Sequence, residues 1–153
     1  MEINPEPVSA APVEIVGCGD IGRRLARLYL QQGIRPHAWV KTDASVLTCK
    51  RLGLSCRRLD LDAGADLARF QQGAHILYTI PPPPQGRADT RITVFLNALR
   101  MHPPEKLVLI STTGVYGDCT GQWVNEETPV RPVVERAWRR ADAETRAHSW
   151  AVE

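Results

Sequence analysis

The sequence has no apolar run that approaches the roughly 20 residues needed to cross a bilayer, so it predicts no membrane span and no membrane partner. Its net charge of +2 is too small to indicate an acidic membrane surface or nucleic acid as a partner. Its 4 cysteines show neither C-x-x-C spacing nor a disulfide-framework pattern, so we expect no metal site. Reduced thiols in a cytoplasmic protein are the simplest interpretation.

What remains is typical of a globular protein, with 43% hydrophobic and 24% charged residues in a chain of 153. Residues 1–12 are rich in proline, alanine and glutamate, and we expect a disordered leader there. Residues 13–153 are expected to form one domain, because this length suits a single hydrophobic core.

Apolar strand-like runs alternate with helical patterns along that domain. We expect strands over residues 13–16, 37–41, 54–61, 74–80 and 106–111, and helices over 23–30, 42–52, 65–72, 90–101 and 133–148. The first helix would turn Ile21, Leu25 and Leu28 to one face, and residues 150–152 would open a further strand. This order predicts an α/β fold with a Rossmann-type, doubly wound parallel sheet of about five to six strands.

The stretch Gly17-Cys18-Gly19-Asp20-Ile21-Gly22, followed by Arg23, lies between the first predicted strand and helix. In that setting G-x-G-x-x-G is the dinucleotide-binding fingerprint. Gly17 permits the tight turn, Gly19 lets the backbone approach a pyrophosphate, and Gly22 allows close packing of helix on strand. An ordinary glycine-rich turn is the alternative. We expect all seven residues from Gly17 to Arg23 to contact a dinucleotide.

In doubly wound sheets, ligands bind outside the carboxyl ends of the strands. The other strand ends therefore supply the remaining candidates for cofactor binding, which are Lys41, Thr42, Asp60, Leu61, Ile80, Pro81, Pro82 and Ser111.

Residues 111–118, Ser-Thr-Thr-Gly-Val-Tyr-Gly-Asp, follow the fifth predicted strand. Together with the glycine loop, this segment resembles the extended short-chain dehydrogenase/reductase family, of the NAD(P)-dependent epimerase/dehydratase kind. The resemblance implies that Thr112 is the catalytic hydroxyl that bonds the reacting oxygen of a substrate. A strand-end hydroxyl bonding its own backbone is the alternative. The resemblance also implies that Asp60 contacts the adenine, although Asp60 could equally cap the next turn.

The sequence departs from that family at the Tyr-x-x-x-Lys pair. Alignment on Pro132, Ala143 and Glu144 puts Arg136 at the tyrosine position and Arg140 at the lysine position. Arginine stays protonated and cannot trade a proton near neutral pH. The family's C-terminal substrate part is also absent after Glu153, so we expect a natural fragment or a truncated sequence.

The end of the second strand bears on cofactor choice. NAD binders usually place an acid there to hold the ribose 2′-hydroxyl. Here Lys41 could instead neutralise a 2′-phosphate with help from Arg23, while Asp43 is the nearby acid. These residues favour NADP, with NAD as the alternative.

We therefore expect an NAD(P)-binding protein with an unknown small-molecule substrate. The family that it resembles consists of enzymes, but we expect this chain alone to be inactive. The alternative is a non-catalytic nucleotide-binding or partner-regulating module, and a homo-oligomer remains open. The arginine-rich helix around residues 135–144 could touch nucleic acid, but its mixed-sign i,i+4 neighbours favour a solvated face.

Overall fold

The structure is a computed structural model, and it describes residues 11–63 and 70–152. Most of the leader predicted over residues 1–12, and most of the helix predicted over 65–72, lie outside the described residues. Within these ranges no helix is long and apolar enough to cross a membrane.

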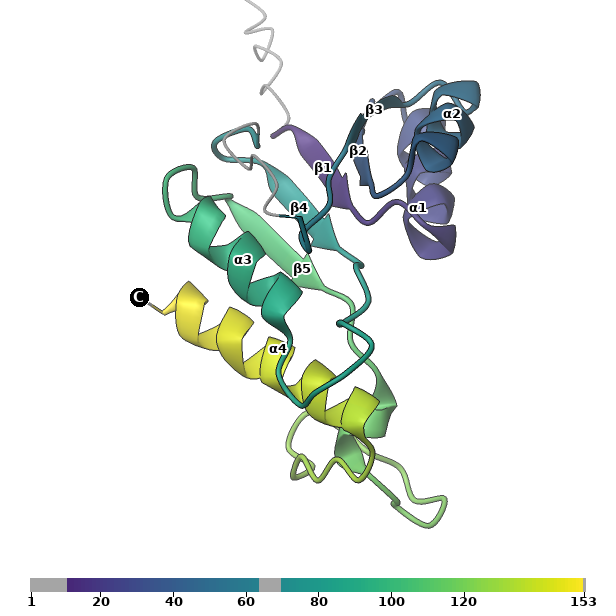
Figure 1. The fold of residues 1–153 in the computed structure, drawn as a ribbon. Helices are drawn as coiled ribbons and strands as arrows, with labels where there is room; N and C mark the ends of the chain where they lie inside the picture. The colour runs from purple at the N-terminus through teal and green to yellow at the C-terminus, as the bar shows by residue number, and fades with distance from the viewer. Residues whose placement is uncertain (1–10, 64–69, 153) are drawn as a thin grey trace, which may run out of the picture.

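Five short strands form one parallel sheet, which confirms the predicted α/β class (Figure 1). The strands are β1 (Val13–Val16), β2 (His37–Val40), β3 (Ser55–Arg58), β4 (His75–Tyr78) and β5 (Lys106–Leu109). Their order is β3-β2-β1-β4-β5, so the polar strand β3 lies at an edge of the sheet. The order reverses between β1 and β4, and in such sheets that point opens a crevice for ligands.

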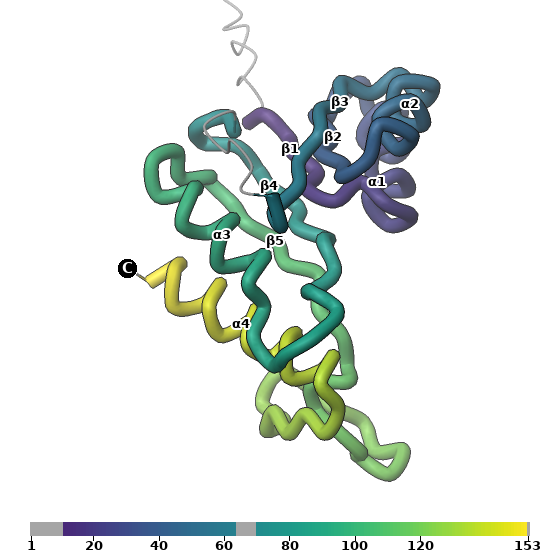
Figure 2. The backbone as a smooth tube through the Cα atoms, in the orientation of Figure 1, coloured from purple at the N-terminus to yellow at the C-terminus, as the bar shows by residue number. Residues whose placement is uncertain are grey.

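Helices cover both faces of the sheet. They are α1 (Asp20–Gln31), α2 (Asp43–Arg51), α3 (Thr90–Leu99) and α4 (Glu135–Ala151), with a 3-10 turn η1 (Thr113–Tyr116) after β5. In Figure 1, α1 and α2 lie on one side of the sheet while α3 and α4 run together on the other. Figure 2 shows the segment between β5 and α4 extending beyond the sheet before the chain turns back.

The predicted strand over residues 150–152 is wrong, because α4 continues through Trp150 to Ala151. Ala143, Ala147 and Trp150 lie at i, i+4 and i+7, so they share one helical face. All three pack on the core beside α3, and that packing extends the helix past the point where the local sequence resembles a strand.

The predicted buried face of α1 is also wrong in part, because Ile21 is 53% and Leu28 56% exposed. The buried residues of this helix are Gly22 and Ala26, one turn apart. A Cβ atom at position 22 would lie 2.9 Å from Cγ2 of Ile15. Small residues therefore let α1 approach β1 closely. Leu25 and Leu30 are partly buried against this core, while Ile21 and Leu28 remain at the surface.

The core under α3 and α4 is built on aromatic rings. The Trp39 and Phe70 centroids lie 4.8 Å apart, and Phe95 follows at 5.5 Å from Phe70. Within this layer Glu14 is only 1% exposed, and it accepts hydrogen bonds from Trp39 Nε1 and from the Gln71 amide. Burial raises the pKa of Glu14, and these two donors oppose the shift.

Candidate functional site

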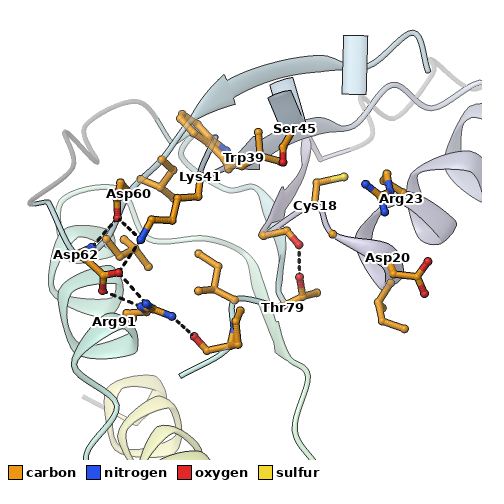
Figure 3. Close-up of a pocket in the computed structure, with 18 residues that line it drawn as sticks. Cys18, Asp20, Arg23, Trp39, Lys41, Ser45, Asp60, Asp62, Thr79 and Arg91 are labelled. Atoms are coloured by element: carbon orange, nitrogen blue, oxygen red, sulfur yellow. Dashed lines mark hydrogen bonds and ion pairs between the residues drawn. The ribbon is translucent and has the colours of Figure 1, made fainter. Parts of the chain in front are cut away.

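A crevice with a volume of about 390 Å³ lies at the carboxyl ends of β1, β2 and β4 (Figure 3). The glycine loop and the start of α1 form one wall, and the residues after β3 and β4 form the other. The lining includes eleven of the predicted cofactor residues: Gly17, Cys18, Gly19, Asp20, Ile21, Arg23, Lys41, Asp60, Leu61, Ile80 and Pro81. The structure thus brings together strand ends that are far apart in the sequence.

The three glycines of the loop differ in why the structure needs, or does not need, glycine at each position. Gly17 has φ +93°, and a Cβ there would lie 2.8 Å from the backbone nitrogen of Ile80, so the turn excludes a side chain. Gly22 is closed in by Ile15, as described above. Gly19 differs, because a Cβ there would meet only the carbonyl oxygen of Gly17, at 3.8 Å. The fold itself therefore leaves the Gly19 position open.

The amino terminus of α1 opens toward this crevice. Gly19 is its N-cap residue and has no side chain. No N-cap side chain therefore accepts a hydrogen bond from the amides of the first turn. Asp20 is paired with Arg24 at 3.1 Å on the exposed surface, while Arg23 lines the crevice. Uncapped amides and the helix dipole together favour an anionic group at this end.

Cys18 is 2% exposed and lies close to Cys49 and Cys56. Burial, and then the neighbouring Cys49, raise the pKa of its thiol to about 12. The thiol is therefore protonated at neutral pH and acts as a small apolar group in the loop.

The opposite wall carries a compact ionic network. Lys41 Nζ lies 2.8 Å from Asp62 and 3.3 Å from Asp60. Arg91, from the first turn of α3, binds the same Asp62 carboxylate and also donates to the carbonyl of Pro81 at 2.9 Å. The hydrogen bonds from Arg91, and then from Lys41, hold the pKa of Asp62 well below its ordinary value. Lys41 is therefore not a free cation.

A second, smaller cavity of about 190 Å³ adjoins the crevice, and the two share Thr79 and Pro81. Pro82, Ser111 and Thr112 line this second cavity, together with Arg136 and Arg140 from α4. Thr112 caps η1, since its side chain accepts a hydrogen bond from the Gly114 amide at 3.3 Å. The alternative role that the sequence left open for Thr112, a hydroxyl bonded to its own backbone, is thus present.

Three of the predicted cofactor residues make local structural contacts, of which those of Gly22 and Asp60 were also expected from the sequence. Thr42 does not line either cavity, because its side chain caps α2 by accepting from the Ser45 amide. Gly22 packs against β1 and does not line the crevice. Asp60 accepts a hydrogen bond from the Asp62 amide at 3.0 Å, so it caps the turn after β3 in addition to facing Lys41.

The arginine-rich helix is not a uniformly solvated basic face. Arg139 is 6% exposed, pairs with Glu135 at 3.5 Å and donates to the Gly86 carbonyl. Arg140 is 8% exposed and donates to the Ile80 carbonyl at 3.3 Å. Glu135 and Arg139 are thus one of the mixed-sign i,i+4 pairs of this helix, whereas Glu144 accepts a hydrogen bond from Ser111.

Sequence reasoning missed Arg91 and Thr79. Arg91 follows a proline-rich segment and carries no local signature, since its role depends on the loop after β3 reaching the start of α3. Thr79 donates its hydroxyl hydrogen to the Gly17 carbonyl, which Figure 3 shows as a dashed line. A hydroxyl directly after the apolar strand β4 was the one available signal.

Comparison with solved structures identifies the fold. UDP-glucuronic acid 4-epimerase from Bacillus cereus, in complex with NAD, matches with TM-score 0.74 and 19% identity, over 93% of this chain and 53% of that one. UDP-glucose 4-epimerase from Brucella ovis, also in complex with NAD, matches with TM-score 0.75 and 18% identity, over 94% and 48%. The UDP-Glc/GlcNAc 4-epimerase from Campylobacter jejuni matches with TM-score 0.75 and 14% identity, over 93% and 49%.

No protein-family model matches the sequence, and no curated protein matches it. The chain spans about half the length of the matching epimerase structures. Over that half, it has the Rossmann-type fold of the epimerases.

Proposed function

We propose that this chain binds a nicotinamide adenine dinucleotide in the crevice between the glycine loop and the Lys41 network. The observation that carries the proposal is the open position of Gly19 at the uncapped start of α1. A backbone that is free of side chains there lets a pyrophosphate reach the amides of the first helical turn. The two epimerases that were solved with NAD support the same ligand class.

The network at the end of β2 argues for NAD over the NADP that the sequence favoured. Lys41 lies between the carboxylates of Asp60 and Asp62, so its charge is already balanced. A 2′-phosphate placed beside Lys41 would also meet these two acids, and like charges repel. We therefore propose that NAD binds at least as tightly as NADP.

For the chemistry, we propose a dinucleotide-binding module that lacks the proton-transfer pair of ordinary short-chain dehydrogenases. Arg136 and Arg140 occupy the two matching positions on α4, and a guanidinium does not exchange protons near neutral pH. A second candidate, an enzyme in which Thr112 polarises a substrate oxygen, is favoured by the position of Thr112 on the second cavity.

Isothermal titration calorimetry of the purified chain with NAD and with NADP tests the first proposal. We expect saturable binding of one dinucleotide per chain. If neither dinucleotide shows measurable binding, the glycine loop is a structural turn and the proposal is wrong.

A further inference from the structure

The second cavity combines positive charge with hydroxyl groups. Arg136 and Arg140 line it from α4, and Thr79, Ser111 and Thr112 line it from the ends of β4 and β5. The remaining lining is apolar, and none of the described residues that line the cavity is acidic. A site with this composition attracts an acceptor that carries negative charge.

Arg140 has hydrogen-bonding capacity that the protein does not use. Its Nη2 donates to the Ile80 carbonyl, but its buried Nη1 has no partner among the described residues. A buried donor without a partner costs stability, and an acceptor in the cavity would remove that cost. The guanidinium fork is also the group that proteins most often use for planar oxyanions.

Arg136 lies one helical turn before Arg140, so the two positive charges share one side of α4. Arg136 is exposed, and it forms no hydrogen bond or ion pair within residues 11–63 and 70–152. Like charges at i and i+4 repel one another. An anion between them would turn this repulsion into attraction to a common partner.

The hydroxyl of Thr112 is also available. Its oxygen accepts from the Gly114 amide, so its hydrogen remains free to be donated. Two acids, Glu144 and Asp89, lie nearby without lining the cavity. Glu144 accepts from Ser111, and Asp89 accepts from the Ile92 amide and faces Arg140 without lining the cavity.

We propose that this cavity is a binding site for the carboxylate or phosphate group of a small molecule, held by Arg136, Arg140 and Thr112. Its volume of 190 Å³ equals that of about six water molecules at roughly 30 Å³ each, which suits one such group with a short substituent. Because the cavity adjoins the crevice at Thr79 and Pro81, the bound anion lies beside the dinucleotide site and not in it.

The test is an NMR titration of the ¹⁵N-labelled chain with inorganic phosphate and with acetate, at constant ionic strength and without any dinucleotide. We expect saturable shifts at the amides of residues 111–114 and 136–140 with at least one of the two anions. Arg136→Gln should weaken this binding by about tenfold or more, because it removes one of two charged donors. Arg27→Gln, which removes an exposed arginine from α1, is the matched control and should leave the affinity unchanged.

Shifts that do not saturate, or an equal effect of Arg136→Gln and Arg27→Gln, would overturn the proposal. Arg140→Lys keeps the charge but loses the fork, and it should also weaken binding. Should that buried variant fail to fold, the exposed Arg136→Gln still decides the question. A repeat with saturating NAD separates the two sites, because a chain that binds phosphate but not NAD refutes only the dinucleotide proposal.

Discussion

The guanidinium of Arg91 forms a two-pronged hydrogen-bonded pair with the carboxylate of Asp62. Nε lies 2.7 Å from Oδ1 and Nη2 lies 2.7 Å from Oδ2, while Nη1 reaches the Pro81 carbonyl at 2.9 Å. One side chain at the start of α3 thus joins the loop after β3 to the end of β4. In the far wall of the crevice, Lys41 adds a further connection from the end of β2 to the same Asp62.

Arg91→Gln is therefore expected to lower the free energy of unfolding by about 1 kcal/mol at neutral pH. A charged hydrogen bond contributes about 1.5–3 kcal/mol, and the Asp62 side chain is 40% exposed, so solvent screening reduces the effect. Because the folded pKa of Asp62 is depressed below 3.8, its contribution is present above that pH and declines as the pH falls toward the folded value.

Urea unfolding of the wild type and of Arg91→Gln at about pH 7 and about pH 3 measures this difference. The loss should be smaller at the lower pH, and Arg27→Gln should show no such trend. A loss that is independent of pH would mean that Arg91 stabilises the wall through its contacts with Pro81 and not through Asp62.

Gly19→Val should abolish dinucleotide binding while leaving the fold intact. The φ of Gly19 is negative, at −79°, and the nearest atom to an added Cβ is 3.8 Å away. The loss of a favourable N-cap residue should cost at most about 1 kcal/mol. Calorimetry with NAD and thermal unfolding measure the two effects.

Gly17→Ala serves as the contrasting variant, because its φ of +93° and the 2.8 Å approach to Ile80 predict a loss of stability. If Gly19→Val binds NAD as the wild type does, no pyrophosphate lies against position 19.

Asp62→Asn should shift the cofactor preference toward NADP. The substitution removes one of the two acids that balance Lys41, and a freed ammonium would attract a 2′-phosphate. We expect the ratio of NADP to NAD affinity to rise by up to about tenfold. In the wild type, Lys41→Ala should change that ratio little.

The double variant completes a cycle, in which Lys41→Ala should cancel the gain made by Asp62→Asn. A large and selective loss of NADP affinity in Lys41→Ala alone would instead favour the NADP preference that the sequence predicts. Calorimetry with both dinucleotides on all four proteins distinguishes the two cases.

We expect no nicotinamide-linked turnover from this chain with alcohols or nucleotide sugars. Positioned acid–base groups contribute about 10²–10⁴ in rate, and the matching positions hold Arg136 and the buried Arg140. Absorbance of the reduced nicotinamide, followed with NAD and NADP across both substrate panels, is the measurement. Turnover would instead be evidence for the second candidate function, and Thr112→Ala should then abolish it.

The fold class and the glycine loop could be predicted from the sequence because both depend on local chemistry. Alternating apolar runs and helical periods identify strands and helices, and the positive φ of Gly17 is a property of a single residue that glycine alone adopts readily. Crossing connections in parallel sheets then place the strand ends at one edge. The predicted crevice followed from these rules without knowledge of any long-range contact.

The charge state of the crevice and the environment of the two arginines were decided only by tertiary structure. Lys41 looked like a free cation in the sequence, but its partners lie after the next strand, and Arg91 reaches one of them, Asp62, from another helix. Likewise, α4 buries Arg140 and extends through Trp150 because α3 and the sheet cover that face. Such pairings depend on which distant segments meet, and a local pattern carries no information about those distances.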